Sequence, residues 1–101
     1  MFSKDDNKVG PYRSNSPVAK RVMKAMAFKN IMVDVLLKPE NRAKGDWKDI
    51  PQEKLVELLD EEIREFKEAL KNGTPMQINS EAADVANFLM MICDNVIELE
   101  Y

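Results

Sequence analysis

Long stretches without glycine or proline constrain the fold of this chain most strongly. Residues 18–38 separate Pro17 from Pro39, and residues 52–72 separate Pro51 from Gly73. Strong helix formers fill the second stretch, and apolar residues recur in it at spacings of three and four. The sequence contains no strand-like alternation, internal repeat or low-complexity tract. It therefore predicts an all-α fold.

The ends of three main helices follow from local signals. Ser16 before Pro17 is typical of an N-cap with proline at the first helical position, so the first helix is predicted over 17–37, ending before Pro39. Asp49 is the predicted cap of the second helix, which has Pro51 in its first turn and continues to Asn72.

The second and third helices are predicted to be separated by a short loop. Gly73 is expected to stop the second helix in the left-handed conformation. Residues 74–78 are then interpreted as the loop, and Asn79 or Ser80 as the cap of a third helix that reaches nearly to residue 101.

Length and composition limit the class of protein. At 101 residues the chain holds one small domain, predicted over 16–101, after a polar arm over 1–15. With 15 basic against 18 acidic residues, a surface built for nucleic acid is not expected. No apolar run approaches the roughly 18 residues needed to cross a membrane, and the first residues lack an apolar signal segment. A single cysteine, Cys93, fits a reducing cytoplasm.

Acidic residues interrupt the apolar stripes of both later helices. A helix turns about 100° per residue, which places Glu62 between Leu58 and Phe66 on one stripe and Glu81 on the stripe of Val85. Glu65 and Asp84 each follow an inward acid by three residues and lie about 60° from it, in the same rotational sense. A short connection makes the helices antiparallel neighbours, so all four carboxylates could meet.

Four carboxylates that face a core need compensation. Desolvating an unpaired carboxylate costs several kcal/mol, so basic side chains must pair with the acids, their pKa values must rise, or a cation must bind. An ion-paired surface would explain one such pair, but two matched pairs favour a site. All-oxygen ligands in a chain without histidine indicate a hard ion, Mg²⁺ or Mn²⁺, of the kind used in phosphate chemistry.

The spacing of these acids resembles that of a known family. Glu62 and Glu65 form ExxE, Glu81 and Asp84 form ExxD, and "DVANF" follows. This combination is similar to the MazG-like all-α nucleoside triphosphate pyrophosphohydrolases, over about half of the chain. The resemblance implies a helical bundle assembled from protomers, and Mg²⁺-dependent hydrolysis of a (d)NTP to the monophosphate and pyrophosphate.

The same resemblance implies roles for single residues. It implies that the metal ligands are Glu62, Glu65, Glu81 and Asp84. Glu61 is a candidate for an outer ligand or for positioning water beside Glu62, and Asn87 is a candidate for a polar contact to the nucleotide. The chain ends soon after the third helix, so a fourth helix of the family would be short or missing.

Other side chains have a functional and an ordinary interpretation. Lys44, Lys48, Arg64 and Lys67 are candidates for phosphate contacts, although each is also consistent with a solvated surface charge. Trp47 could stack on a base or serve as a packing anchor.

Apolar residues on the first helix and on a second face of the third exceed what one thin domain covers, which predicts a homodimer or homotetramer. The second face comprises Ala83, Ala86, Met90, Cys93 and Ile97.

An alternative function is a helical interaction or regulatory module that has the same fold and no catalysis. In such a module the four acids would be salt-bridged, and Mg²⁺ would have no effect.

Overall fold

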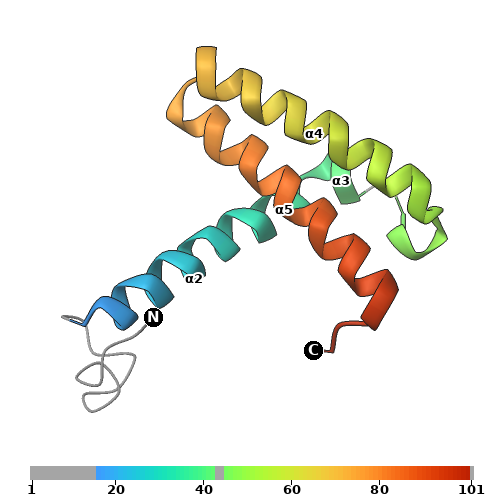
Figure 1. The fold of residues 1–101 in the computed structure, drawn as a ribbon, viewed down its shortest axis with the longest axis horizontal. Coiled ribbons are helices and arrows are strands. Elements are labelled where there is room, and N and C mark those ends of the chain that lie inside the picture. Colours follow the sequence, from blue (N-terminus) through green and yellow to red (C-terminus); the bar gives the residue numbers. More distant parts are fainter. Residues whose placement is uncertain (1–15, 43–44, 101) are drawn as a thin grey trace. The chain divides into compact units, whose positions relative to one another are not determined.

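The computed structural model describes residues 16–42 and 45–100 of the chain, and within these ranges every regular element is helical (Figure 1). Three helices are long: α2 (Pro17–Leu36), α4 (Gln52–Asn72) and α5 (Pro75–Ile97). Between α2 and α4 lie the short helix α3 (Pro39–Arg42) and the 3₁₀ helix η1 (Trp47–Asp49). The predicted all-α class with three main helices is confirmed. The proposed arm over 1–15 lies outside the described residues.

The chain divides into two compact units, Met1–Asn30 and Ile31–Tyr101. In the described part of the first unit, the Ala19 amide donates a hydrogen bond to Ser16 Oγ at 2.9 Å, which confirms the predicted N-cap of α2. The second unit contains the end of α2, both short helices, α4 and α5, and all the candidate site residues discussed below.

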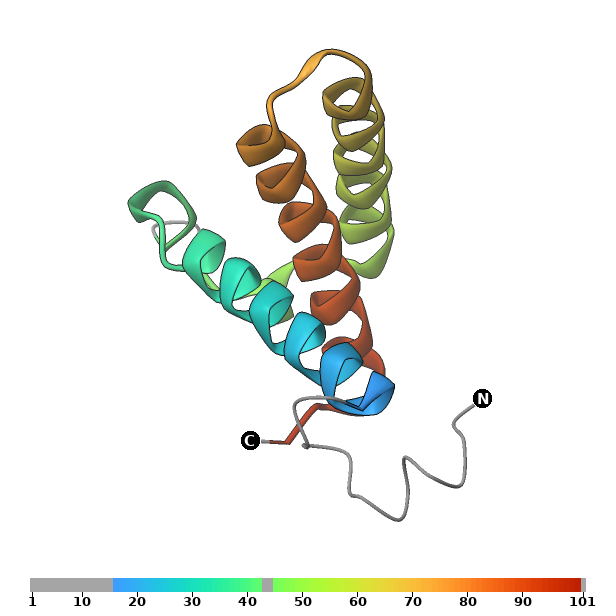
Figure 2. The same cartoon turned by 90° about the vertical axis from the view of Figure 1, so that its left-hand side faces the viewer.

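Helices α4 and α5 form an antiparallel pair (Figures 1 and 2). Gly73 ends α4, but the prediction of a left-handed glycine is wrong, because its backbone is extended at φ −91° and ψ 169°. Its amide donates to the Ala69 carbonyl at 2.7 Å. A Cβ atom at position 73 would lie 2.8 Å from that carbonyl oxygen, so close approach rather than dihedral freedom favours glycine here.

The third main helix begins earlier than predicted. Thr74 Oγ1 accepts from the Gln77 amide at 3.2 Å, and the Gln77 side chain accepts from the Thr74 amide at 2.8 Å, which completes a capping box. Pro75 occupies the first turn. The predicted loop over 74–78 and the predicted caps Asn79 and Ser80 are therefore wrong, because threonine before proline already satisfies the free amides.

Side-chain hydrogen bonds fix the described parts of the connection between α2 and α4. Asp46 caps η1 by accepting the Lys48 amide at 2.9 Å, and the Asn41 side chain donates to the Val35 carbonyl at 2.7 Å. The predicted cap of α4, Asp49, instead lies inside η1, and Pro51 precedes α4 without a side-chain cap. The connection thereby holds Trp47 and Lys48 on a defined turn.

The core of the second unit is small and partly polar. Its buried apolar residues are Val35, Leu55, Ala69 and Ala83, and Asn87 and Asp94 on α5 are buried with them. Ala83, which was expected on an uncovered face, is fully buried, whereas Leu89 and Val96 of the same helix are exposed. No helix among the described residues is long and apolar enough to cross a membrane. A cytoplasmic location stays a prediction.

Candidate functional site

Three carboxylates from two helices meet at one point of the α4–α5 pair. Glu62 comes from α4, and Glu81 and Asp84 come from α5. One oxygen of each lies within 4.8 Å of the others, and all three side chains are partly buried. These three residues are called the acidic cluster below. The antiparallel packing of α4 and α5 brings the two helical motifs opposite one another.

Glu65 lies at the border of the acidic cluster. It is exposed on α4, yet its charge and its hydrogen bonding raise the pKa of both Glu62 and Glu81. Glu61 is exposed on the same helix. The geometry thus brings Glu65 next to the acidic cluster, as an outer acid.

Burial and mutual repulsion alter the acidity of Glu62. Loss of hydration, followed by the charges of Asp84 and Glu65, raises its pKa from 4.5 to about 7. One of its oxygens, Oε2, is buried without a hydrogen-bond partner among the described residues. A carboxylate in this state is destabilised when it is ionised and no cation is present.

Glu81 is in the same situation. Burial raises its pKa, followed by the charges of Glu65 and Asp84, and its Oε2 also lacks a hydrogen-bond partner among the described residues. Lys38 acts in the opposite direction and lowers this pKa. The Lys38 ammonium lies 3.5 Å from Ser80 Oγ, next to Glu81 in the chain, so Lys38 is a cation at the edge of the acidic cluster.

The donor atoms of the acidic cluster fit a hard divalent cation. All of them are carboxylate oxygens, which Mg²⁺ and Mn²⁺ prefer. The two unpaired, buried oxygens of Glu62 and Glu81 are the atoms for which a cation would supply the missing partner.

A cavity of about 540 Å³ adjoins the acidic cluster. Glu62, Asp84 and Asn87 line it on one side, and Lys38 and Trp47 also contribute to its wall. Asn87 is 3% exposed, and its side-chain nitrogen donates to the Met32 carbonyl at 3.1 Å. That bond fixes the amide, so Asn87 Oδ1 remains a buried acceptor without a partner among the described residues. The cavity therefore combines carboxylates, a cation, an amide acceptor and an aromatic ring.

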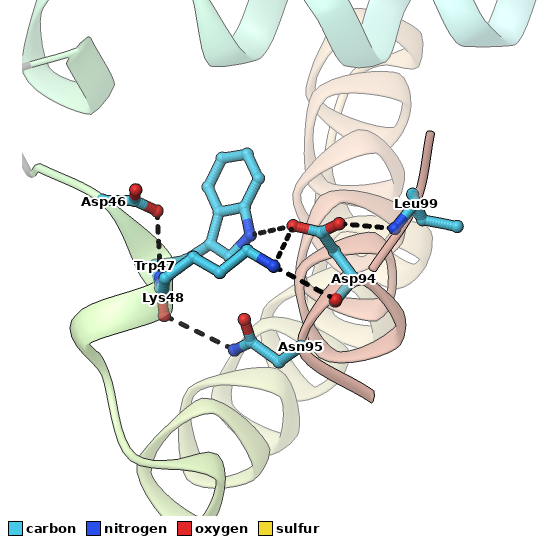
Figure 3. A network of polar contacts seen from close by, with 6 residues as sticks. All are labelled: Asp46, Trp47, Lys48, Asp94, Asn95 and Leu99. Carbon is cyan, nitrogen blue, oxygen red and sulfur yellow. Dashed lines mark hydrogen bonds and ion pairs between the residues drawn. The ribbon is translucent and has the colours of Figure 1, made fainter. Parts of the chain in front are cut away.

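Trp47 and Lys48 are both held by Asp94 of α5 (Figure 3). The indole Nε1 donates to Asp94 Oδ2 at 2.9 Å, and the Lys48 ammonium lies 3.3 Å from the same oxygen. The Leu99 amide donates to Asp94 Oδ1 at 2.8 Å. These contacts lower the pKa of Asp94. The hydrogen bond from Trp47 has the largest effect, followed by the hydrogen bond from Leu99 and the contacts with Lys48.

The sequence-based candidates divide by position. The structure brings together Glu62, Glu81, Asp84, Asn87 and Trp47 around one cavity or its adjoining acidic cluster. Arg64 and Lys67 are exposed on α4, and Lys44 lies outside the described residues. Lys38 and Asp94 were not singled out from the sequence, since a lysine before a proline and an acid near a helix end carry no local signal of a site.

The comparison with protein families identifies a match over most of the second unit. Residues 32–99 match the model of the phosphoribosyl-ATP pyrophosphohydrolase family. Neither the curated proteins nor the solved structures contain a match to the chain. The matched range covers about two thirds of the chain and includes the acidic cluster, the cavity and the Asp94 contacts. This chain therefore belongs to the phosphoribosyl-ATP pyrophosphohydrolase family, within the MazG-like all-α nucleoside triphosphate pyrophosphohydrolases.

Proposed function

We propose that this protein hydrolyses a nucleoside triphosphate, with (d)NTPs as the substrate class, to the nucleoside monophosphate and pyrophosphate in the presence of Mg²⁺, for which Mn²⁺ can substitute. The family supports pyrophosphohydrolase action on a nucleotide. The observation that carries the proposal is the meeting of Glu62, Glu81 and Asp84, with two buried unpaired oxygens, beside a cavity of nucleotide-compatible size.

In this proposal the chain's acids hold the cation and orient water. Glu62, Glu81 and Asp84 supply the inner ligands, and Glu65 completes the set from the border of the acidic cluster. The bound cation would screen the negative charge of the triphosphate and polarise a phosphoryl oxygen. Glu61, or a carboxylate oxygen of Glu62, accepts the proton of the attacking water. Attack at the α-phosphorus breaks the bond to the bridging oxygen, and pyrophosphate leaves with the electron pair.

The remaining wall of the cavity recognises the nucleoside. Asn87 Oδ1 accepts a hydrogen bond from a sugar hydroxyl or a base amino group, and Trp47 stacks on the base. Lys48 and Lys44 are the further phosphate contacts proposed from the sequence. Lys48 is already paired with Asp94, so a phosphate would have to share its ammonium group with that carboxylate.

A substrate panel tests the proposal. Canonical (d)NTPs and phosphoribosyl-ATP, the compound in the family's name, are incubated with Mg²⁺ or Mn²⁺ and followed by ³¹P NMR. Pyrophosphate and a monophosphate are the expected products. Release of orthophosphate and a diphosphate would contradict attack at the α-phosphorus.

The alternative is an interaction module with the same fold and no catalysis. Under this alternative no compound in the panel is cleaved, and Mg²⁺ changes neither stability nor any other property of the acidic cluster. The unpaired oxygens of Glu62 and Glu81 favour the enzyme, because a salt-bridged cluster would leave fewer carboxylate oxygens without a partner.

Lys38 is expected to contact the phosphates. It lines the cavity and lies close enough to Glu81 to lower that residue's pKa. Lys38→Met should raise KM for the triphosphate by about 10-fold or more, as expected for loss of one charge-assisted contact of about 1.5–3 kcal/mol. Steady-state kinetics check this, with Lys71→Met on the exposed surface of α4 as the matched control. Equal effects of the two changes would show that Lys38 acts only through net charge.

We further propose that the protein assembles as a homodimer or homotetramer. Among the described residues, eleven large apolar side chains are exposed, including Met76 at 80% and Val96 at 70%, whereas only six apolar residues are buried. Such an excess of exposed apolar surface is typical of an interface, and two-fold symmetry is the usual arrangement. Light scattering coupled to gel filtration at micromolar concentration should give twice or four times the 11.6 kDa chain mass. A stable single-chain mass would contradict this proposal.

A further inference from the structure

Asp94 is a buried acid outside the acidic cluster, and its side chain joins α5 to Trp47 and Lys48 of η1 and to Leu99 after the end of α5. It is 8% exposed, and both of its carboxylate oxygens are engaged: Oδ2 by Trp47 and Lys48, and Oδ1 by the Leu99 amide (Figure 3). Its backbone carbonyl also accepts from the Lys48 ammonium at 3.3 Å. Burying a carboxylate is costly unless such donors surround it, so these contacts stabilise one arrangement of the connection on α5.

The tryptophan is held at two points. Its indole nitrogen donates to Asp94, and its backbone carbonyl accepts from the Asn95 side chain at 3.4 Å. Two consecutive residues of α5 therefore hold Trp47: Asp94 fixes its ring, and Asn95 fixes its backbone. Trp47 itself lines the cavity that Glu62, Asp84 and Asn87 also line, and it lines a second cavity near Asp94. The orientation of the indole thus determines the shape of one wall of the proposed nucleotide pocket.

We infer that Asp94 is a positioning residue that fixes the indole of Trp47 as the stacking wall for the nucleobase. This inference rests on the proposed function, because it assigns a role within the same cavity. Asp94 would act on the binding of the base and leave the chemistry at the phosphates to the acidic cluster. An aromatic ring can stack on any nucleobase, so a fixed Trp47 indole favours the binding of nucleotides over sugar phosphates or polyphosphate.

The chemistry of the contacts requires an acid at position 94. An ionised carboxylate only accepts hydrogen bonds, and here it meets donors from three groups. Asparagine has the same shape but presents an amino group on one side. In Asp94→Asn that amino group must face either the Trp47 indole N–H or the Leu99 amide, and two donors then oppose one another.

The chain's single tryptophan makes the test direct, because its fluorescence reports only on Trp47. Wild type is titrated with the nucleoside monophosphates, which cannot release pyrophosphate, and with ribose 5-phosphate as a probe without a base. At least one monophosphate should quench the emission, and ribose 5-phosphate should not. In Asp94→Asn the emission maximum should shift and the monophosphate should bind about 10-fold more weakly, in line with the loss of one stacking contact.

Two further variants separate positioning from a general structural role. Asp49→Asn makes the same change of acid to amide within η1, where Asp49 is exposed, and should bind the monophosphate as wild type does. Binding to Trp47→Phe, measured by calorimetry, should weaken as in Asp94→Asn, and the double variant should weaken no further than either single one, because both changes remove one coupled element.

Wild-type affinity in a folded Asp94→Asn, or additive losses in the double variant, would overturn the inference. If circular dichroism shows that Asp94→Asn does not fold, the inference is tested by NMR on wild type. The indole N–H resonance of wild type should be protected from exchange and should shift on saturation with monophosphate. A resonance that does not shift overturns the inference. Quenching without any pyrophosphate release from triphosphates would contradict the proposed function alone.

Discussion

Glu62→Gln and Glu81→Gln should each lower pyrophosphate release by about 100-fold or more, since even residues that only support metal ligands are worth roughly 10–100-fold. Each change removes a charged oxygen from the acidic cluster, where one oxygen of each residue lies within 4.8 Å of the others. Asp84→Asn should have a similar effect, because Asp84 belongs to the same cluster. Glu65→Gln should have a smaller effect than these, because Glu65 is exposed and lies at the border. Rates measured at saturating nucleotide and several Mg²⁺ concentrations check these expectations.

Two acids on the opposite side of α4 provide matched controls. Glu57 and Glu68 are exposed, and Glu68 accepts a hydrogen bond from the neighbouring Asn72 side chain at 2.7 Å. Glu57→Gln and Glu68→Gln should keep activity within about two-fold of wild type, as exposed positions usually do. Equal losses at inward and outward positions would mean that net negative charge matters, and not the geometry of the cluster. Circular dichroism must show that every variant remains folded.

The metal-free protein should melt at a lower temperature at pH 8 than at pH 5. Burial, together with the charges of neighbouring carboxylates, raises the pKa of Glu62 from 4.5 to about 7, and the same causes raise the pKa of Glu81. Between the unfolded and the folded pKa, the native state binds more protons than the unfolded state, so stability falls as the pH rises through this window. After a discount for partial exposure to solvent, about 1 kcal/mol is expected from Glu62, or roughly 4–8 °C in Tm for a domain of this size.

Chelator-treated protein in thermal melts from pH 5 to 8 measures this effect. Glu62→Gln should flatten the dependence, and Glu57→Gln should leave it unchanged. Asp94 acts in a different window: its pKa is lowered, so its stabilisation is lost only when the pH falls below its unfolded value of 3.8. A Tm that rises from pH 5 to pH 8 in the metal-free wild type would contradict the assigned environment of Glu62.

Helical periodicity was enough to predict the acidic cluster. The rotation per residue places Glu62 and Glu81 on the inner faces of neighbouring helices, and the structure brings their oxygens together with those of Asp84. The ends of the helices were harder to predict where two signals competed. Ser16 and Thr74 both precede a proline and both cap a helix, but the sequence signals favour only the first as a cap, because Asn79 and Ser80 offer a later start for α5.

Contacts between distant segments could not be predicted from periodicity. The bond from Trp47 to Asp94 spans 47 residues, and the approach of Lys38 to Ser80 spans 42. Neither pair has a local sequence signal, since each depends on how the connection folds back on α5. The same limit applies to the buried face of α5, where Asn87 and Asp94 are buried because polar partners from other segments reach them.

Cation binding tests most directly the central claim that carboxylates of α4 and α5 form a divalent metal site. Mn²⁺ binding is measured by electron paramagnetic resonance, and competition by Mg²⁺ is measured in the same samples. Wild type should bind Mn²⁺, release it to excess Mg²⁺ and melt at a higher temperature with either ion, since the ions bind only the folded state. The Glu62→Gln, Glu81→Gln double variant should bind neither ion at concentrations that saturate wild type. Without metal, its melting temperature should be higher than that of wild type. Equal Mn²⁺ binding by wild type and the double variant, or no binding by wild type, would contradict the account.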